Sequence, residues 1–132
     1  MREIVLPTIR SVAELRHNNP EAAIRHLEIV QPHDLSTLLS LSSMYYRGLA
    51  HLAMHNAELA TVQFQNIYEH RAVALNSLYV TVAGLGLARA HLLTNELDNA
   101  RGEYERFFDL WKDADSDVPI LLNAKVEYAN LK

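Results

Sequence analysis

The sequence predicts an all-α protein in which antiparallel helix pairs repeat along the chain and stack into a solenoid. Apolar residues recur at three- and four-residue spacing along the 132 residues, and the β-branched alternation typical of strands is nearly missing. Turn signals between the predicted helices are short, so consecutive helices should pack antiparallel. Residues 45–71 also match a later part of the chain without a gap when they are moved forward by 40 positions.

This periodicity predicts six helices in three pairs, followed by a closing helix. Their spans are 7–17, 20–31, 35–55, 57–70, 78–94, 97–111 and 118–131. Asn19 should cap the second helix, because an asparagine oxygen accepts a hydrogen bond from an end amide and Pro20 suits the first helical position. Asn56, Ser77 and Asp117 are the predicted caps of later helices.

The internal alignment defines equivalent positions in the three pairs. Moving residues 45–71 forward by 40 places Ala50, His51, Leu52, Ala60, Phe64 and Ile67 on Ala90, His91, Leu92, Ala100, Tyr104 and Phe107. Moving them back by 37 places Ala50, Ala60, Phe64 and Ile67 on Ala13, Ala23, Leu27 and Val30. Each second helix thus has an alanine and, four positions later, a bulky residue, which suits a helix that packs into its neighbour's groove. The first-helix alanines should also lie at close helix contacts.

This pattern resembles the tetratricopeptide repeat (TPR), a helix pair with a small residue late in its first helix and an alanine and then an aromatic residue in its second. The matching residues are Gly48 and Ala88, then Ala60 and Ala100, then Phe64 and Tyr104. Met44 and Gly84 replace the family tryptophan, and the repeats exceed the usual length of about 34 residues. The resemblance implies one domain, residues 1–132, folded as a right-handed α-solenoid. Its repeats would span 7–31, 35–70 and 78–111, with a capping helix at 118–131.

Residues 64–131 are similar to the C-terminal TPR arrays of bacterial membrane-anchored serine/threonine protein kinases and related regulators. The segments that carry this likeness are FQNIYEHRAVALN, LGLARAHLL, FFDLWKDADSDVPIL and AKVEYANL, which begin at Phe64, Leu85, Phe107 and Ala124. The sequence has no glycine-rich nucleotide loop, HRD-type catalytic segment or DFG motif, so kinase activity is not implied. The resemblance implies a bacterial sensory or scaffolding module, either cytoplasmic or in the extracytoplasmic part of a larger membrane-anchored protein.

Charge and composition exclude several functional classes. The 12 basic residues are spread singly among 16 acidic ones, unlike the clustered lysines and arginines of a nucleic-acid-binding surface. Cysteine is absent, which excludes disulfides and thiolate zinc sites. No apolar run approaches the roughly 20 residues of a membrane span, so the chain is expected to be soluble. Asp113, Asp115 and Asp117 alternate, but an apolar run from Val118 replaces the further ligands of a calcium loop.

His51 and His55 are four residues apart, a spacing that can chelate zinc, and His91 repeats the position of His51. A zinc site needs a third ligand, and the glutamate of an HExxH motif is missing, so packing or solvent-facing roles are favoured for these histidines. Gly84 and Gly86 are interpreted as close helix contacts, because no strand precedes them as a dinucleotide loop would require. We expect no catalytic activity, no metal and no cofactor, with a histidine metal or enzyme site as the weaker alternative.

In TPR domains the first helices of successive repeats line a concave groove, and this register assigns six residues to it. They are Ser42, Tyr45, Leu49, Val82, Leu85 and Arg89. Tyrosine and arginine are enriched at binding hot spots, so Tyr45, Leu49 and Arg89 are the predicted anchors of a protein or peptide partner. The competing interpretation is a homodimerisation element, in which a second copy of the chain covers this apolar face.

Overall fold

The structure is a computed structural model that describes residues 2–33, 40–72, 78–115 and 117–131. Over these residues the chain forms seven α-helices and a short 3-10 helix, and it has no strand. The helices are α1 (Arg2–Arg16), α2 (Pro20–Glu28), η1 (Gln31–His33), α3 (Ser40–Ala53), α4 (Ala57–Glu69), α5 (Leu78–Leu93), α6 (Leu97–Leu110) and α7 (Pro119–Ala129). The all-helical prediction and the number of helices are confirmed.

The first helix is longer than the sequence predicts, because it begins at Arg2 and contains Pro7. Proline has no amide and so removes one helical hydrogen bond, the one to the carbonyl of Glu3. The loss is tolerated because Pro7 lies near the N-terminus of α1, where the first amides have no helical partner. Helix α2 ends at Glu28, before the predicted residue 31, and η1 follows it. The predicted start of the third helix at residue 35 lies outside the described residues.

The predicted caps have different outcomes. Asn56 caps α4 as expected, since its side chain accepts a 3.2 Å hydrogen bond from the amide of Leu59. Asn19 occupies the cap position of α2 but donates instead to the carboxylate of Glu14, at 3.1 Å. The assignment of Asp117 is wrong, because Val118 is the cap of α7.

The turns inside the three helix pairs share one geometry. Each contains a residue with a left-handed backbone: Asn18 (φ 57°), His55 (φ 57°) and Asn95 (φ 61°). The next amide then donates to a carbonyl five residues earlier, from Asn19 to Glu14, from Asn56 to His51 and from Glu96 to His91, at 2.8–2.9 Å. The left-handed residues are 37 and 40 positions apart, which are the shifts of the sequence alignment. The repetition in sequence therefore corresponds to repeated local structure.

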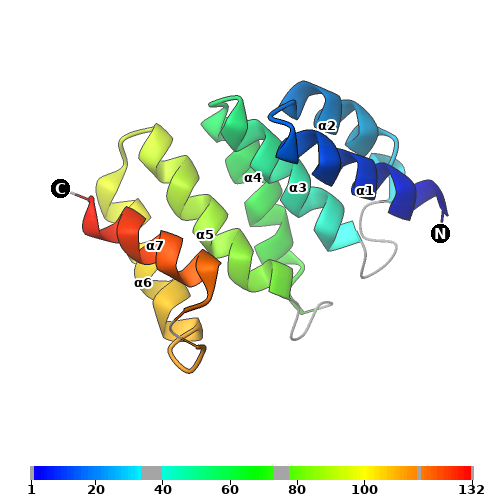
Figure 1. Cartoon of the computed structure of the whole chain (residues 1–132). Coiled ribbons are helices and arrows are strands. Elements are labelled where there is room, and N and C mark those ends of the chain that lie inside the picture. Colours follow the sequence, from blue (N-terminus) through cyan, green and yellow to red (C-terminus); the bar gives the residue numbers. More distant parts are fainter. Residues whose placement is uncertain (1, 34–39, 73–77, 116, 132) are drawn as a thin grey trace.

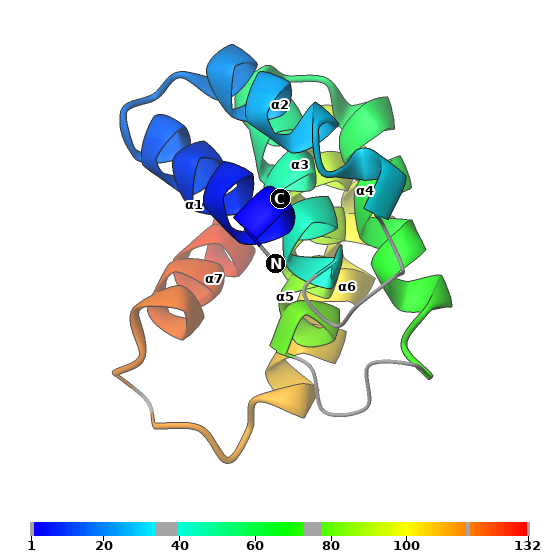
Figure 2. The same ribbon diagram turned by 90° about the vertical axis from the view of Figure 1, so that its right-hand side faces the viewer.

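Packing is mainly between helices that are neighbours in sequence. Helix α1 packs with α2, α3 with α4, and α5 with α6, while α2–α3 and α4–α5 contacts join successive pairs. The first helices of the pairs also touch, since α3 contacts both α1 and α5. Figure 1 shows the pairs in sequence order along the molecule, with α7 beside α6. In Figure 2, α4 and α6 lie on one side of α3 and α5, and α1 and α7 on the other.

Equivalent positions in the second helix of each pair, or just after it in the case of Val30, are buried alike. Nine residues of the alignment are no more than 1% exposed: Ala23, Ala60 and Ala100; Leu27, Phe64 and Tyr104; Val30, Ile67 and Phe107. In the first helices, Ala50 and Ala90 are buried, but Ala13 is exposed. The predicted close contact at Ala13 is wrong because no described helix precedes α1 to cover that face.

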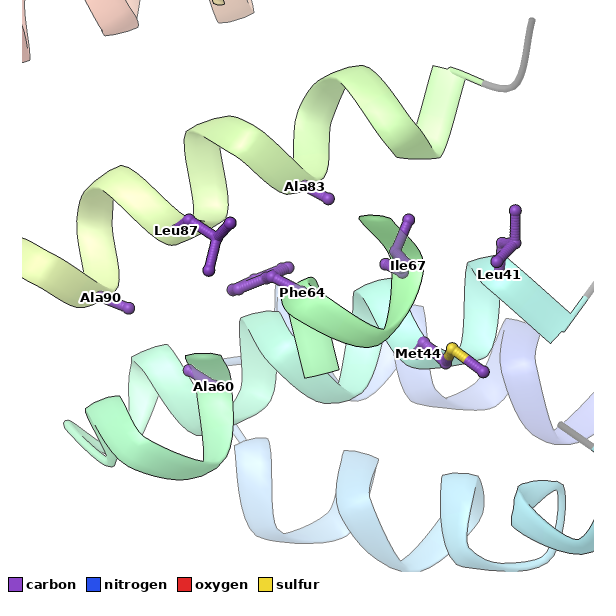
Figure 3. Packing of buried hydrophobic residues seen from close by; sticks show 8 residues of the cluster. All are labelled: Leu41, Met44, Ala60, Phe64, Ile67, Ala83, Leu87 and Ala90. Atoms are coloured by element: carbon purple, nitrogen blue, oxygen red, sulfur yellow. The ribbon is translucent and has the colours of Figure 1, made fainter. Parts of the chain in front are cut away.

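The ring of Phe64 is enclosed where α3, α4 and α5 meet (Figure 3). A Cβ atom on Gly48 of α3 would lie 2.5 Å from two atoms of this ring, and one on Gly86 of α5 would meet the ring equally closely. A Cβ atom on Gly84 would collide with the hydroxyl of Tyr68. The glycines of α5 therefore serve close helix packing, as the sequence predicts.

None of the helices in the described parts of the chain combines the length and the apolar character needed to cross a membrane.

The glycines around Phe64 generate a stability prediction. Gly48→Ala and Gly86→Ala should each lower the free energy of unfolding by about 1–3 kcal/mol, because the added methyl group overlaps a buried ring. Gly102→Ala is the matched control, since nothing lies within 4 Å of its Cβ position, and alanine there should stabilise α6 by roughly 0.5–1 kcal/mol. Urea unfolding measures the free energy of unfolding of all three variants. Similar changes in the three variants would contradict the packing role.

Candidate functional site

A cavity of about 230 Å³ opens between α1, α3 and α5. Its lining residues are Ile4, Val5, Thr8, Ile9 and Val12 from α1, Ser42 and Tyr46 from α3, and Tyr79 from α5. One wall is thus aliphatic, the other is aromatic, and none of the lining residues is charged. We call this site the tyrosine cavity.

Three tyrosines form the aromatic wall and its support. The ring of Tyr45 lies 5.4 Å from that of Tyr46 and 5.6 Å from that of Tyr79, and the rings of Tyr46 and Tyr79 are 6.4 Å apart. Tilted and edge-to-face arrangements at these distances are favourable for aromatic pairs. Tyr45 also contacts the buried ring of Phe64, at 6.1 Å, so the cluster is attached to the core.

The hydroxyl group of Tyr79 remains protonated at neutral pH. Burial raises the pKa of Tyr79 to about 12, and the neighbouring Tyr46 and Tyr45 add to the rise. Tyr79 makes hydrogen bonds with both Tyr46 and Ser42. Burial also raises the pKa of Tyr45, although the Arg89 charge opposes the rise. The site therefore offers neutral hydroxyl groups next to apolar surface.

The residues assigned to the groove from sequence do not all reach this cavity. Ser42 lines it, and Tyr45 supports it from behind. Leu49 is partly buried against the core around Phe64, while Val82 and Leu85 are only 5% and 1% exposed. Val82 and Leu85 are therefore largely occupied by packing within the chain.

Arg89 is engaged in an interaction that joins α5, α6 and α7. Its Nε and Nη2 atoms donate to the two carboxylate oxygens of Glu127, at 3.1 and 2.8 Å. The buried Tyr104 hydroxyl donates to the same carboxylate at 2.6 Å. Both charged side chains are 30% exposed. Arg89 thus holds the closing helix on the array, a role that its position in the sequence did not indicate.

The charge state of Glu127 follows from these contacts. Burial alone would raise the pKa of its carboxyl group, but the hydrogen bonds from Arg89 and Tyr104, together with the Arg89 charge, outweigh burial and lower it. Burial and the same carboxylate raise the pKa of Tyr104, so its hydroxyl group remains a donor. The cluster is consistent with a permanent charged pair at neutral pH.

Tyr46 and Tyr79, the aromatic wall, were missed by sequence reasoning. The TPR register places Tyr45 on the groove, and Tyr46 is its neighbour on the same helix, so only the structure shows that both rings contact the ring of Tyr79. The aliphatic wall was missed because the first helix was predicted to begin at residue 7, which omits Ile4 and Val5. The apolar character of Ile4 and Val5 could have indicated that the helix extends to these residues.

The histidines do not form a metal site with described residues. His51 is in α3, but His55 lies beyond the end of that helix with a left-handed backbone, so the assumed helical spacing of this pair is wrong. Burial, and then the Arg47 charge, lowers the pKa of His51. His91 Nδ1 lies 3.4 Å from a carboxylate oxygen of Glu96. Within the described ranges no three His, Cys, Asp or Glu side chains are grouped to hold a metal ion.

Two hydrogen bonds between α6 and α7 allow a matched test of the closing helix. Tyr104→Phe removes a buried donor to the ion-paired Glu127 and should lower the free energy of unfolding by about 1.5–3 kcal/mol. Tyr128→Phe removes a 2.8 Å hydrogen bond to the exposed Glu105 and should cost no more than about 0.5 kcal/mol. Chemical unfolding measures the difference. Equal losses would show that the buried cluster has no special role.

The lowered pKa of Glu127 also predicts a pH dependence. The stabilisation is complete above the ordinary glutamate pKa of roughly 4.3 and is lost as the pH falls through the lower value of the folded state, because the unfolded chain then binds the proton more readily. Glu127→Gln should therefore reduce the loss of stability on acidification. The free energy of unfolding of both chains is measured from neutral pH to about pH 3. Parallel curves for the variant and the natural chain would contradict the predicted role of Glu127.

Comparison of the chain with protein families, curated proteins and solved structures finds no match. What is established is an all-helical arrangement of seven helices packed in sequential pairs over the described residues.

Proposed function

We propose that this chain is a non-catalytic protein-interaction module that binds a segment of a partner polypeptide in the tyrosine cavity. The observation that carries the proposal is the composition of the cavity, which combines an aliphatic wall with tyrosine hydroxyl groups and has no charged lining residue. Ligand sites are typically apolar clefts with a few placed polar groups. Tyrosine is also enriched at binding hot spots.

The chemistry of the cavity favours an apolar side chain flanked by peptide groups. The aliphatic residues of α1 can cover such a side chain, and the hydroxyl groups of Tyr46 and Tyr79 can exchange hydrogen bonds with a peptide backbone. At about 230 Å³, the cavity is below the roughly 300–1,000 Å³ of drug-sized ligand sites. It therefore suits one or two side chains of a longer segment, which would continue over the surface.

The TPR resemblance supports the same location. In that family the first helices of successive repeats line the binding groove, and here α1, α3 and α5 supply every lining residue of the cavity. The proposal keeps Ser42 from the groove residues predicted by sequence and adds Tyr46 and Tyr79 as anchors. Tyr45 becomes a supporting residue, and Arg89 acts in the docking of α7.

The proposal is tested with a random peptide library displayed on phage and selected on the immobilised domain. A selected peptide should bind Tyr46→Ala and Tyr79→Ala variants more weakly by about 1–2 kcal/mol or more, as expected for hot-spot residues. Isothermal titration calorimetry measures this, and circular dichroism confirms that each variant is folded. Tyr128→Ala is the matched control, because Tyr128 packs at the α7 end of the molecule.

Peptides that bind the natural chain and both cavity variants equally would overturn this assignment. A library that yields no binding peptide would do the same. Loss of binding in the Tyr128→Ala variant alone would move the site to the region around α7.

A further inference from the structure

Helix α1 is apolar on two opposite faces. Its buried face consists of Ile4, Pro7 and Ser11. Leu6 and Ile9 on the opposite face are 44% and 58% exposed, and Ala13 continues the same line. These three residues follow the alternating spacing of three and four positions that is typical of a helix-packing seam.

The repeat register identifies this exposed seam as a stacking surface. In α3, which is 37 positions later, the seam residues Leu6 and Ala13 correspond to the buried Ser43 and Ala50, and Arg10 beside the seam corresponds to the buried Arg47. Ile9 corresponds to Tyr46, which is half-buried and lines the tyrosine cavity. Arg47 reaches back to the preceding pair, where its Nη1 lies 3.5 Å from the carbonyl oxygen of Leu27. This face of α1 is thus equivalent to the face of α3 that the preceding helix pair covers, but no described helix covers it on α1.

We infer that a second copy of this chain covers the seam, through an antiparallel pair of α1 helices related by a two-fold axis. In such a pair, Leu6 packs against Ile9 of the partner subunit, and Ile9 packs against the partner's Leu6. The contact between Leu6 and Ile9 therefore occurs twice, once in each half of the symmetric interface.

The positions that flank the seam complement each other in this register. On the side of the tyrosine cavity, Val5 lies opposite Val12 of the partner subunit, so this flank is apolar. On the other side, Glu3 lies opposite Arg10 of the partner subunit, and symmetry repeats this pair. Glu3 and Arg10 are exposed and form no ion pair or side-chain hydrogen bond with another described residue, so both charges are available.

Other arrangements of the two helices lack this complementarity. Sliding the antiparallel helices by one heptad brings Arg10 opposite the partner's Arg10, which is repulsive. A parallel pair places Arg10 beside Val5 of the partner subunit and leaves Glu3 without an opposite charge. Flanking charges select orientation and register in paired helices, so the antiparallel pair with Glu3 facing Arg10 is the arrangement that we propose.

Sedimentation equilibrium of the full chain tests this directly. The natural chain should dimerise reversibly. Glu3→Arg or Arg10→Glu alone should raise the dimer dissociation constant at least about tenfold, because each change places like charges at two symmetric sites. The double variant Glu3→Arg/Arg10→Glu should return the constant to within about threefold of the natural value, since it restores both pairs with exchanged charges.

The control changes exposed apolar residues at the other end of the molecule. Leu6→Ser/Ile9→Ser should abolish the dimer, whereas Leu122→Ser/Val126→Ser, which alters the exposed face of α7, should leave it unchanged. Val5, Ile9 and Val12 of α1 also line the tyrosine cavity, so a variant on the other wall separates the two tests. Tyr79→Ala, which removes an anchor of that cavity, should weaken peptide binding and leave the dimer unchanged. Circular dichroism verifies folding of each variant. A chain that stays monomeric at high concentration, or a double charge variant as weak as the single ones, overturns the inference.

Discussion

The contact on which the rest of the structure depends is the fit of one aromatic ring between two glycines. Phe64 on α4 lies against Gly48 of α3 and Gly86 of α5, where a Cβ atom would overlap the ring. The distance between α3 and α5 is therefore set by the thickness of a phenyl group. Tyr46 and Tyr79 project from these two helices, so the same contact determines how the aromatic wall of the tyrosine cavity is assembled.

The helical architecture was predictable because its signals are local and repeated. The three- and four-residue spacing located every helix, and the internal alignment identified the buried positions of the second helices, such as Ala60 and Ala100. The ends of helices were less predictable. Pro7 within α1 and Val118 at the cap of α7 break local preferences that are weak near a helix end. The exposure of Ala13 was not predictable from repetition, because its equivalents Ala50 and Ala90 lie in pairs that follow another described pair, whereas no described helix precedes α1.

The candidate site was harder to predict, since it depends on which polar residues the chain uses within its own structure. Sequence register places Arg89 on the groove, and nothing in the sequence links it to Glu127, 38 positions later. An ion pair between residues so far apart in sequence depends on the packing of α7, which local sequence patterns do not predict. Tyr46, in contrast, was not assigned to the groove, and it becomes part of the cavity wall only because α3 and α5 lie together in the fold. The six groove residues assigned by register come from α3 and α5, two of the three helices that line the cavity, and only Ser42 among them is a lining residue.

The restriction of packing to sequence neighbours has a consequence for how the chain folds. Chains with mainly local contacts have low contact order and reach the native state quickly. Stability in such arrays is a sum over neighbouring units, so opening begins at the ends and proceeds inward. The part built around Phe64 belongs to the middle pair and is covered on both sides, which makes it the segment whose amide protons exchange last. Helix α7 lies at one end of the described array and is packed on one side only, where an ion pair, two hydrogen bonds and apolar contacts hold it, so unfolding should start there.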